Sequence, residues 1–208
     1  NVVYFTEVVE ENVLLRFKEK QMAATVKGVS NDFQRMTKID SIMVNGSFLL
    51  NDGAFDYTIA GVGLAQNLGL GAYFVDPLYI YVPKRTQKIN LARPEAGFNA
   101  RTVFTSGVFS VQQAEYDNKY LILPISLAQE LFEYNTDMVT AVELRVANEK
   151  KVKSVKKEIQ TILGDRFKVK DRYEQQESYF RIMQVEKWIT YLILSFILLI
   201  AVFNIIGS

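Results

Sequence analysis

Carboxylates are the side chains in this sequence that come nearest to catalytic chemistry. The candidates are Glu10, Glu11, Asp52, Asp56 and Asp117. Two carboxylates with different pKa values can serve as general acid and general base, as in glycoside hydrolysis. Nothing in this spacing marks such a pair, and carboxylates at turns usually do no more than keep the turn solvated. An enzyme that uses these carboxylates is therefore a secondary hypothesis for this chain. A cleft holding two carboxylates with raised pKa values would support it.

Residue types that most other enzyme chemistry needs are absent. The chain of 208 residues has no histidine and no cysteine, which excludes Cys/His zinc sites, Ser-His-Asp and Cys-His nucleophiles, and disulfides. The net charge is +1, from 24 Lys and Arg against 23 Asp and Glu, so no overall positive field is available to hold nucleic acid. We therefore expect a protein that is not an enzyme, needs no cofactor or metal ion, and binds no nucleic acid.

One glycine-rich stretch, TIAGVGLAQNLGLG at residues 58–71, is a candidate phosphate-binding loop. Gly61-x-Gly63 follows a strand-like run and opens a short helix, as a dinucleotide-binding loop does. Gln66 stands where the third glycine belongs, and no long crossover helix follows. The pattern therefore favours a tight strand-to-helix turn over a phosphate site.

With 49% hydrophobic residues the chain can bury a core, and the patterning of its first half predicts strands. Val2–Val29 predicts two or three strands, with polar breaks at 10–11 and 18–21. Residues 31–40 read as a polar connection with a helical turn. Asn45-Gly46, between two apolar runs, predicts a hairpin, and Pro77–Pro83 alternates as a strand does.

The second half alternates strands and helices. Residues 120–124 predict a strand that ends at Pro124, before a helix that starts at Ser126 with Gln129 completing a capping box. A strand at 141–148 precedes a helix that Asn148 caps and Gly164 ends; its apolar stripe is Val152, Val155, Ile159, Ile162 and Leu163. A further strand from Arg166 completes a split α+β unit of the ferredoxin kind. We expect the lysines of this helix to form a solvated face.

The end of the chain, WITYLILSFILLIAVFNIIGS at 188–208, carries no charge. At about 1.5 Å per residue, a helix from Trp188 to Ile206 covers roughly 29 Å, close to the thickness of a bilayer's hydrocarbon core. A helix apolar on all faces would need a larger core than this domain offers if it were buried in protein. The sequence predicts the start of a transmembrane helix, continuous with a helix from Arg172 to Lys187 or joined to it through a kinked amphipathic connector. Because the chain opens on Asn1 and not on Met, we expect a fragment of a longer protein.

Four stretches carry a resemblance to a known family. They are ATVKGVS (24–30), IAGVGLAQNLGL (59–70), GVFSVQQAEYDNKYLILPISLAQELF (107–132) and EKWITYLILSFILLIAVFNIIGS (186–208). In this order they resemble the periplasmic region of lipoprotein-releasing (Lol-type) ABC transporter permeases, within the larger group with a MacB-like periplasmic core and an FtsX-like permease. Family members often follow L-G-L with Gly-Asp and a hydrophobic pair, whereas Gly71 here leads to AYFVDP, so this loop departs from the pattern.

The resemblance implies an α+β fold with an insertion. A porter-like subdomain (ferredoxin-like, split βαβ) would comprise residues 1–40 and 118–173. An inserted, mostly-β, Sabre-like subdomain would comprise 41–117. A linking helix would follow at 174–187, and 188–208 would begin a transmembrane helix.

The resemblance also implies a role in transport on the periplasmic face of the bacterial inner membrane. Cytoplasmic ABC ATPase subunits would act through the membrane part of the permease, which pairs with a second permease subunit, identical or paralogous. By mechanotransmission, the domain would couple ATP hydrolysis to the extraction of lipoprotein cargo and its hand-over to a periplasmic carrier. In the alternative, a MacB/FtsX-like domain acts through an adaptor protein or regulates a cell-wall hydrolase.

Two sets of residues would make the contacts that this role needs. A protruding loop within residues 84–102 would bind the carrier or adaptor near its tip, through Leu91, Ala92, Arg93, Pro94, Glu95 and Phe98. Its mix of Pro, Arg and aromatic suits a contact, and an ordinary surface loop is the alternative. Lipid or cargo would lie near Tyr179, Phe180, Met183 and Trp188, just above the membrane. Ordinary helix packing is the alternative for this second set.

Overall fold

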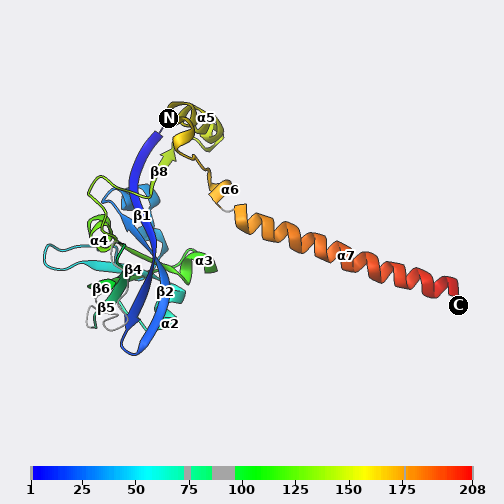
Figure 1. The fold of residues 1–208 in the computed structure, drawn as a ribbon, viewed down its shortest axis with the longest axis horizontal. Coiled ribbons are helices and arrows are strands. Elements are labelled where there is room, and N and C mark those ends of the chain that lie inside the picture. Colours follow the sequence, from blue (N-terminus) through cyan, green and yellow to red (C-terminus); the bar gives the residue numbers. More distant parts are fainter. Residues whose placement is uncertain (1, 73–75, 86–96, 176, 208) are drawn as a thin grey trace. The chain divides into compact units, whose positions relative to one another are not determined.

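The computed structural model describes residues 2–72, 76–85, 97–175 and 177–207, without the side chains of 177–182, 202 and 204–207. These residues form two compact units, one over Val2–Arg145 and one from Val146 onward. We call them the N-terminal unit and the C-terminal unit and describe each by itself (Figure 1).

The N-terminal unit begins with a long β-hairpin. β1 (Val2–Phe17) and β2 (Lys20–Val29) pair antiparallel from Val8↔Val29 to Phe17↔Lys20. Lys18 lies in the two-residue turn with φ 52°, in the left-handed region that tight hairpins use. The predicted break at residues 18–21 is therefore confirmed. The break predicted at residues 10–11 is wrong, because both glutamates pair across to β2 within an uninterrupted strand.

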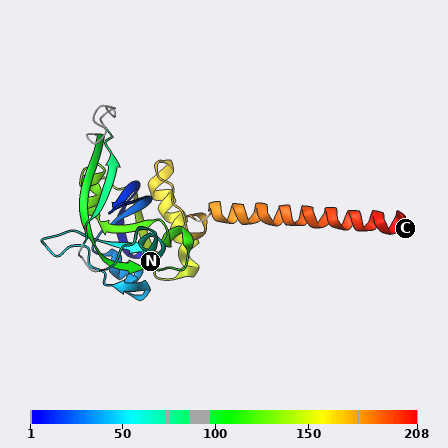
Figure 2. The ribbon, with the colours of Figure 1, turned by 90° about the horizontal axis from the view of Figure 1, so that it is seen from below.

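Six strands of this unit pair in a closed ring. After β2 come β7 (Tyr120–Pro124), β4 (Tyr57–Gly61), β6 (Phe98–Phe109) and β5 (Leu78–Pro83); β5 then pairs with β1, which returns to β2. The β2–β7 and β4–β6 pairs are parallel, and the other ring pairs are antiparallel. β3 (Met43–Gly46) pairs with β6 off this path, and β8 (Ala141–Val146) pairs with β1. Figure 2 shows β5 and β6 side by side, as the two arms of a hairpin.

The interior of the ring holds the main core. Val9, Val13 and Leu15 of β1 are at most 5% exposed, and two short helices, α2 (Val62–Leu68) and α4 (Ile125–Leu131), add apolar side chains to the same cluster. A second cluster forms around α1 (Phe33–Thr37) and the 3-10 turn η1 (Ile39–Ile42). The predicted helical turn is thus present as α1, but the connection is not only polar, because Phe33, Met36 and Ile39 are buried. Burial of each large aliphatic side chain contributes about 1.5–3 kcal/mol, so the ring is a packed body and not an open channel.

The hairpin predicted at Asn45-Gly46 is wrong. β3 pairs antiparallel with β6, more than 60 residues further along, in a register that sets Gly46 opposite Gly107. Gly46 has φ 71°, and a Cβ on it would lie 2.1 Å from the carbonyl oxygen of Ser106. Glycine is needed here because two strands approach closely, and not because a tight turn joins two neighbouring strands.

The capping box predicted for α4 is also wrong. Pro124 is the N-cap, no side chain caps the helix, and α4 starts at Ile125. Gln129 is buried, and its Nε2 donates to the carbonyls of Thr136 at 3.0 Å and Met138 at 3.1 Å. It fixes the turn after the helix, where the backbone would otherwise leave carbonyls unsatisfied. A further single-turn helix, α3 (Ala114–Asp117), precedes β7.

The C-terminal unit is helical. A 3-10 turn, η3 (Glu149–Lys151), leads into α5 (Val152–Leu163), and the Asn148 side chain caps it by accepting a hydrogen bond from the Lys150 N–H at 2.9 Å. The predicted helix end at Gly164 is confirmed, and Asn148 is a cap as predicted, although of the turn η3 that precedes α5 and not of α5 itself. After them come a 3-10 turn, η4 (Gly164–Arg166), then α6 (Arg172–Gln175) and the long α7 (Glu177–Gly207).

The strand predicted from Arg166 is wrong. Residues 164–166 form the turn η4, and residues 167–171 have no regular secondary structure. The predicted split βαβ unit is thus present only as β8 and α5, within a mixed α/β fold. The subdomain boundaries at 40/41 and 117/118 remain a prediction, because the two compact units meet at 145/146 and not at these positions.

Candidate functional site

The candidate carboxylates of β1 accept hydrogen bonds from tyrosine hydroxyls. Tyr120 donates to Glu10 at 2.7 Å, and Tyr134 donates to Glu11 at 2.8 Å. Burial, reinforced by the Glu10 carboxylate, raises the pKa of the Tyr120 hydroxyl. Both tyrosines therefore stay protonated donors at neutral pH, and each engages one of the two glutamates.

Asp52 and Asp56 shape a surface loop. Asp52 accepts hydrogen bonds from the N–H groups of Ala54 at 2.9 Å and Phe55 at 2.8 Å, and from the Tyr57 hydroxyl at 2.7 Å. These bonds, the Phe55 N–H first, lower the pKa of Asp52. Asp56 accepts from the side chain of Asn51 at 2.7 Å. The lowered pKa makes Asp52 a poor general acid, and the hydrogen bonds of both aspartates stabilise the loop.

Asp117 is buried and performs a similar task inside the unit. It accepts from the Ser110 hydroxyl at 3.0 Å and from the Val111 N–H at 2.8 Å, which closes the turn between β6 and α3. In the described part of the chain no cluster of three or more acidic side chains could hold a metal ion. The five candidate carboxylates are thus not brought together as an acid/base pair.

The glycines of the candidate phosphate loop are packing residues. The predicted strand-to-helix turn is present, since Gly61 ends β4 and α2 begins at Val62. A Cβ on Gly61 would lie 2.4 Å from the carbonyl oxygen of Asp117, and one on Gly63 would lie 1.8 Å from Oδ1 of Asn118. The α3–β7 connection therefore occupies the space above both glycines. With only seven residues, α2 is also a weak source of the helix dipole that phosphate binding uses.

The β5–β6 hairpin carries the loop that we predicted to bind a carrier or adaptor. The Lys84 N–H donates to the Gly97 carbonyl at 2.8 Å, which joins the two arms. Phe98 is the partly buried first residue of β6. The other five predicted residues lie outside the described residues: Leu91, Ala92, Arg93, Pro94 and Glu95. Partner binding by this loop stays a prediction.

The first arm of this hairpin is fixed by Arg85. Its guanidinium lies 4.4 Å from the centre of the Tyr134 ring and donates to the Tyr134 hydroxyl at 2.6 Å and to Glu11 at 2.8 Å. Burial and the Glu11 carboxylate raise the pKa of the Tyr134 hydroxyl, while Arg85 opposes that rise. A cation above an aromatic ring with a shared carboxylate combines two attractive contacts, so the arm is held on β1 and on the turn after α4.

The second arm is fixed to the same turn. Asn99 Nδ2 donates to the carbonyl of Leu131 at 3.0 Å and to Glu133 at 3.1 Å, and Arg101 pairs with Glu130. Exposed ion pairs contribute at most about 1 kcal/mol each, so these contacts set the direction of the hairpin more than the stability of the unit. We did not predict them. The sequence does place Arg85 on one arm and Asn99 on the other, beside a long loop, and this could have indicated that both arms make polar contacts.

The predicted membrane helix is present as part of α7. Met183–Ala201 has the length and composition to cross a membrane. Of the residues predicted to lie near lipid or cargo, Met183 is 37% exposed and Trp188 is 77% exposed. The side chains of Tyr179 and Phe180 lie outside the described residues. Most of the large apolar side chains from Met183 to Phe203 are exposed. Their exposure to water would be costly, so this part of α7 requires an apolar environment.

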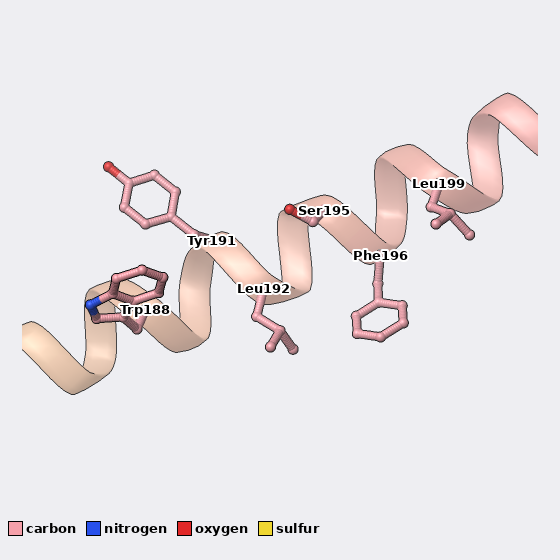
Figure 3. A pocket seen from close by; sticks show the side chains of 6 residues that line it. All are labelled: Trp188, Tyr191, Leu192, Ser195, Phe196 and Leu199. Carbon is pink, nitrogen blue, oxygen red and sulfur yellow. The ribbon is translucent and has the colours of Figure 1, made fainter.

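One side of α7 presents an apolar surface with a small residue at its centre. Figure 3 shows Ser195 between larger side chains, and the lining is Trp188, Tyr191, Leu192, Ser195, Phe196 and Leu199. All six belong to one helix, so this surface is a shallow hollow along α7 and not an enclosed pocket. A hollow of this kind suits acyl chains or another helix, and it offers no catalytic group.

Comparisons with known proteins found relatives by structure only. No protein-family model matches the chain, and no curated protein sequence matches it. The extracellular domain of the noncanonic ABC-type transporter YknZ from Gram-positive bacteria is similar, with TM-score 0.53 and 15% identity over 79% of this chain and 75% of that one. The periplasmic region of MacB from Actinobacillus actinomycetemcomitans gives TM-score 0.47 and 12% identity over 77% of this chain and 67% of that one. A domain of a permease protein from Porphyromonas gingivalis gives TM-score 0.41 and 16% identity over 79% and 65%.

At this level of identity the comparison with YknZ establishes similarity of fold. Function does not follow from fold alone, because one fold can carry unrelated activities. The mixed α/β fold and the apolar helix within α7 are the features of this chain on which a functional proposal rests.

Proposed function

We propose that this chain is the extracytoplasmic domain, with the following membrane helix, of an ABC transporter permease. The observation that carries the proposal is the combination of a fold similar to the YknZ extracellular domain with an apolar helix long enough to span a membrane at its C-terminal side. The domain has no catalytic role. It transmits movement between membrane helices and a protein outside the membrane, while ATPase subunits on the other side supply the energy.

The geometry supports an N-terminal unit that moves as one body. Each of the six strands of the ring pairs with two neighbours, and the hairpin that carries the loop is fixed to the ring at both arms through Arg85 and Asn99. A movement of the ring is therefore passed to the loop without being absorbed at its base. Such rigid-body motion is a common way to couple distant sites.

The finer proposal concerns the cargo. The sequence resemblance to lipoprotein-releasing permeases favours a domain that helps to extract an acylated protein and hands it to a periplasmic carrier, with an inner-membrane location. The second candidate is a domain of the MacB/FtsX-like kind, which acts through an adaptor protein or regulates a cell-wall hydrolase. The similarity to the extracellular domain of YknZ is compatible with this second candidate.

Site-specific photo-crosslinking in cells distinguishes the two. The full-length protein would carry a photoreactive amino acid at Phe98, at the base of the loop, or at Trp188, at the start of the membrane helix. Phe55, which is exposed in the loop before β4, serves as the control position. An ATPase-inactive partner subunit shows which products depend on ATP hydrolysis.

The lipoprotein reading predicts an acylated protein captured at Trp188 and a soluble carrier at Phe98, both dependent on ATP hydrolysis and absent at Phe55. Capture of an adaptor or a hydrolase at Phe98, with no acylated protein at Trp188, supports the second candidate. Identical products at all three positions, unaffected by ATPase inactivation, contradict the proposed coupling itself.

A further inference from the structure

Charge is distributed unequally between the two units. Residues 1–145 carry 13 Lys and Arg against 16 Asp and Glu, a net charge of −3, whereas residues 146–208 carry 11 against 7, a net charge of +4. The balanced total of the whole chain therefore conceals one basic unit and one acidic unit. The basic unit is the one that contains the apolar helix α7.

Basic residues occupy every second position from Arg166, at the end of η4, to Arg172, at the start of α6. Arg166, Lys168, Lys170 and Arg172 are all exposed, and none has an ion-pair partner in the described part of the chain. Two of the acidic neighbours, Asp171 and Glu174, are already engaged, whereas Asp165 is exposed and forms no ion pair in the described part of the chain. Lys156 on α5 pairs with Asp171 at 3.7 Å and with Glu174. Four exposed cations are therefore set against a single exposed carboxylate that is not engaged by Lys156, that of Asp165, and the segment keeps a net positive charge.

Lys156 stays engaged over the whole range near neutral pH. Its hydrogen bond to Glu174 raises the pKa of Lys156 and lowers the pKa of Glu174. Asp171 has a lowered pKa because it accepts the Glu174 N–H and, less strongly, because Lys156 is near. Both carboxylates thus remain charged and paired, and they do not neutralise the four exposed cations.

The same segment is held in an ordered form against α5. Gln160 donates from Nε2 to the Phe167 carbonyl at 2.9 Å, and its Oε1 accepts the Val169 N–H at 3.1 Å. One side chain thus satisfies the backbone on both sides of Lys168. Large apolar side chains in and next to this segment are exposed to solvent: Ile162 is 82% exposed, Phe167 is 62% exposed and Tyr173 is 75% exposed.

We propose that residues 162–173 bind the surface of a membrane that contains anionic phospholipid. Unpaired cations attract anionic headgroups, and exposed aliphatic and aromatic side chains between them enter the boundary of headgroups and acyl chains. The contact rests on the proposed membrane insertion of α7, whose apolar span begins at Met183, only 10 residues after Tyr173. It anchors the C-terminal unit to the bilayer at a second place and limits its tilt.

A bilayer fits this surface better than a protein partner does. The same element supplies charge and exposed apolar area, and it is joined by a short connection to a helix that is already in the membrane. Such a surface needs no complementary shape in its partner, since lipids adapt to it. A nearby second tether also binds at a high effective concentration, so modest intrinsic affinity is sufficient.

The absence of cysteine and the presence of a single tryptophan make the test direct. Ile162→Cys in the full chain, labelled with an environment-sensitive dye and reconstituted into vesicles, reports whether the segment is in lipid. Val44→Cys, exposed in the N-terminal unit, is the matched control. Trp188 fluorescence, measured with brominated lipids in the unlabelled chain, reports separately whether α7 is inserted. Vesicles are either pure phosphatidylcholine or contain a third of phosphatidylglycerol.

A charge variant tests the electrostatic part. Arg166→Gln, Lys168→Gln and Lys170→Gln together remove three exposed charges and leave Lys156 intact. The matched control removes three charges from the N-terminal unit that also lack a described ion pair: Lys38→Gln, Lys84→Gln and Lys119→Gln. Because each basic residue near an anionic surface contributes several-fold in affinity, the first variant should weaken the contact by more than about tenfold. Phe167→Ser tests the apolar part without changing charge.

We expect the dye at position 162 to be blue-shifted and shielded from iodide in anionic vesicles only. The triple variant and Phe167→Ser should each reduce the shielding, and the control triple and the dye at position 44 should show no change. Equal iodide access in both kinds of vesicle, with Trp188 quenched by brominated lipid, overturns this inference and leaves the membrane helix intact. Trp188 without quenching overturns both. Shielding that persists in neutral vesicles and grows with the ratio of protein to lipid shows a second copy on the surface instead, which also overturns the lipid assignment.

Discussion

Replacing Gly61 by alanine tests whether the Gly61-x-Gly63 stretch is a packing contact. A Cβ on Gly61 would lie 2.4 Å from the carbonyl oxygen and 2.9 Å from the carbonyl carbon of Asp117, and these are backbone atoms that cannot rotate away. The φ of Gly61 is −62°, which alanine adopts freely. Overpacking costs about 1–3 kcal/mol, and the loss of glycine's freedom in the unfolded chain offsets about 0.4–1 kcal/mol of it. We expect Gly61→Ala to lower the free energy of unfolding by about 1–2 kcal/mol.

Gly63 provides the matched comparison. A Cβ there would meet Oδ1 of Asn118 at 1.8 Å, the far end of a side chain. Gly63→Ala should also destabilise the protein, and Asn118→Ala in the same chain should restore most of the loss. Asn118→Ala should not rescue Gly61→Ala, because the obstacle there is backbone.

Urea unfolding followed by circular dichroism, in a mild detergent that keeps α7 soluble, gives the midpoint and slope for each variant. The packing account is refuted if Gly61→Ala is as stable as the unaltered chain. A nucleotide or phosphate that stabilises the unaltered chain, but not Gly61→Ala, would instead support the phosphate-binding alternative.

Three further changes test other parts of the structure. Ile80→Ala, in the fully buried interior of the ring, should cost about 2–5 kcal/mol in the same urea assay, and a smaller loss would mean that the ring is loosely packed. Arg85→Gln removes the cation that opposes the rise in the pKa of Tyr134, so NMR of labelled tyrosine should show this hydroxyl titrating at higher pH; an unchanged titration would mean that the contact is absent in solution. The pKa of Asp171 is lower in the folded chain than in the unfolded chain. Its ionised carboxylate therefore stabilises the folded state above the unfolded-state pKa of about 4, and this contribution is lost as the pH falls through the pKa of the folded state. The protection factor of the Val169 amide, corrected for intrinsic exchange, should therefore hold between about pH 7 and 5 and fall in more acidic solution, and constant protection in acid would argue against the ion pairs.

Local patterns in the sequence predicted the elements that local physics decides. Alternation in residues 77–83 predicted β5, because half-buried strands repeat every two residues. The cap at Asn148 and the end at Gly164 followed from the backbone geometry of helix termini. The uncharged stretch after Lys187 predicted a helix long enough to span a membrane, since it contains no charged side chain that would need hydration.

Features that depend on distant parts of the chain were not predictable in this way. Asn45-Gly46 reads as a hairpin turn, yet its partner strand is β6, and sequence alone does not show which strand will approach. Gln129 fits a capping box by spacing, but the buried carbonyls of the following turn compete for its amide. Arg85 and Tyr134 are 49 residues apart, so only the folded ring shows that they meet. The candidate site thus depends more on tertiary contacts than the helices and strands do.

The ring bears directly on whether residues 41–117 form a separable subdomain. β4, β6 and β5 come from this segment and form one continuous arc, while β7, β2 and β1 come from its flanks. The arc joins the flanks at two seams. At one, Ile59 and Ala60 of β4 pair with β7, and at the other, β5 pairs with β1 from Leu14 to Arg16. Both seams are built from backbone hydrogen bonds over a shared core.

Removal of residues 41–117 should therefore unfold the flanks and not release a smaller folded domain. Without the arc, Leu15 and Leu121, both fully buried, would face water, and β7 and β1 would each present an open edge. We expect a chain in which a short Gly-Ser linker replaces 41–117 to show no cooperative urea transition and no slowly exchanging amides in β2 or β7. A cooperative transition with Leu121 still protected from exchange would show that the flanks have a core of their own. In that case residues 1–40 and 118–173 are a thermodynamic unit, as the proposed porter-like subdomain requires, and the ring is an interface between two domains and not a single core.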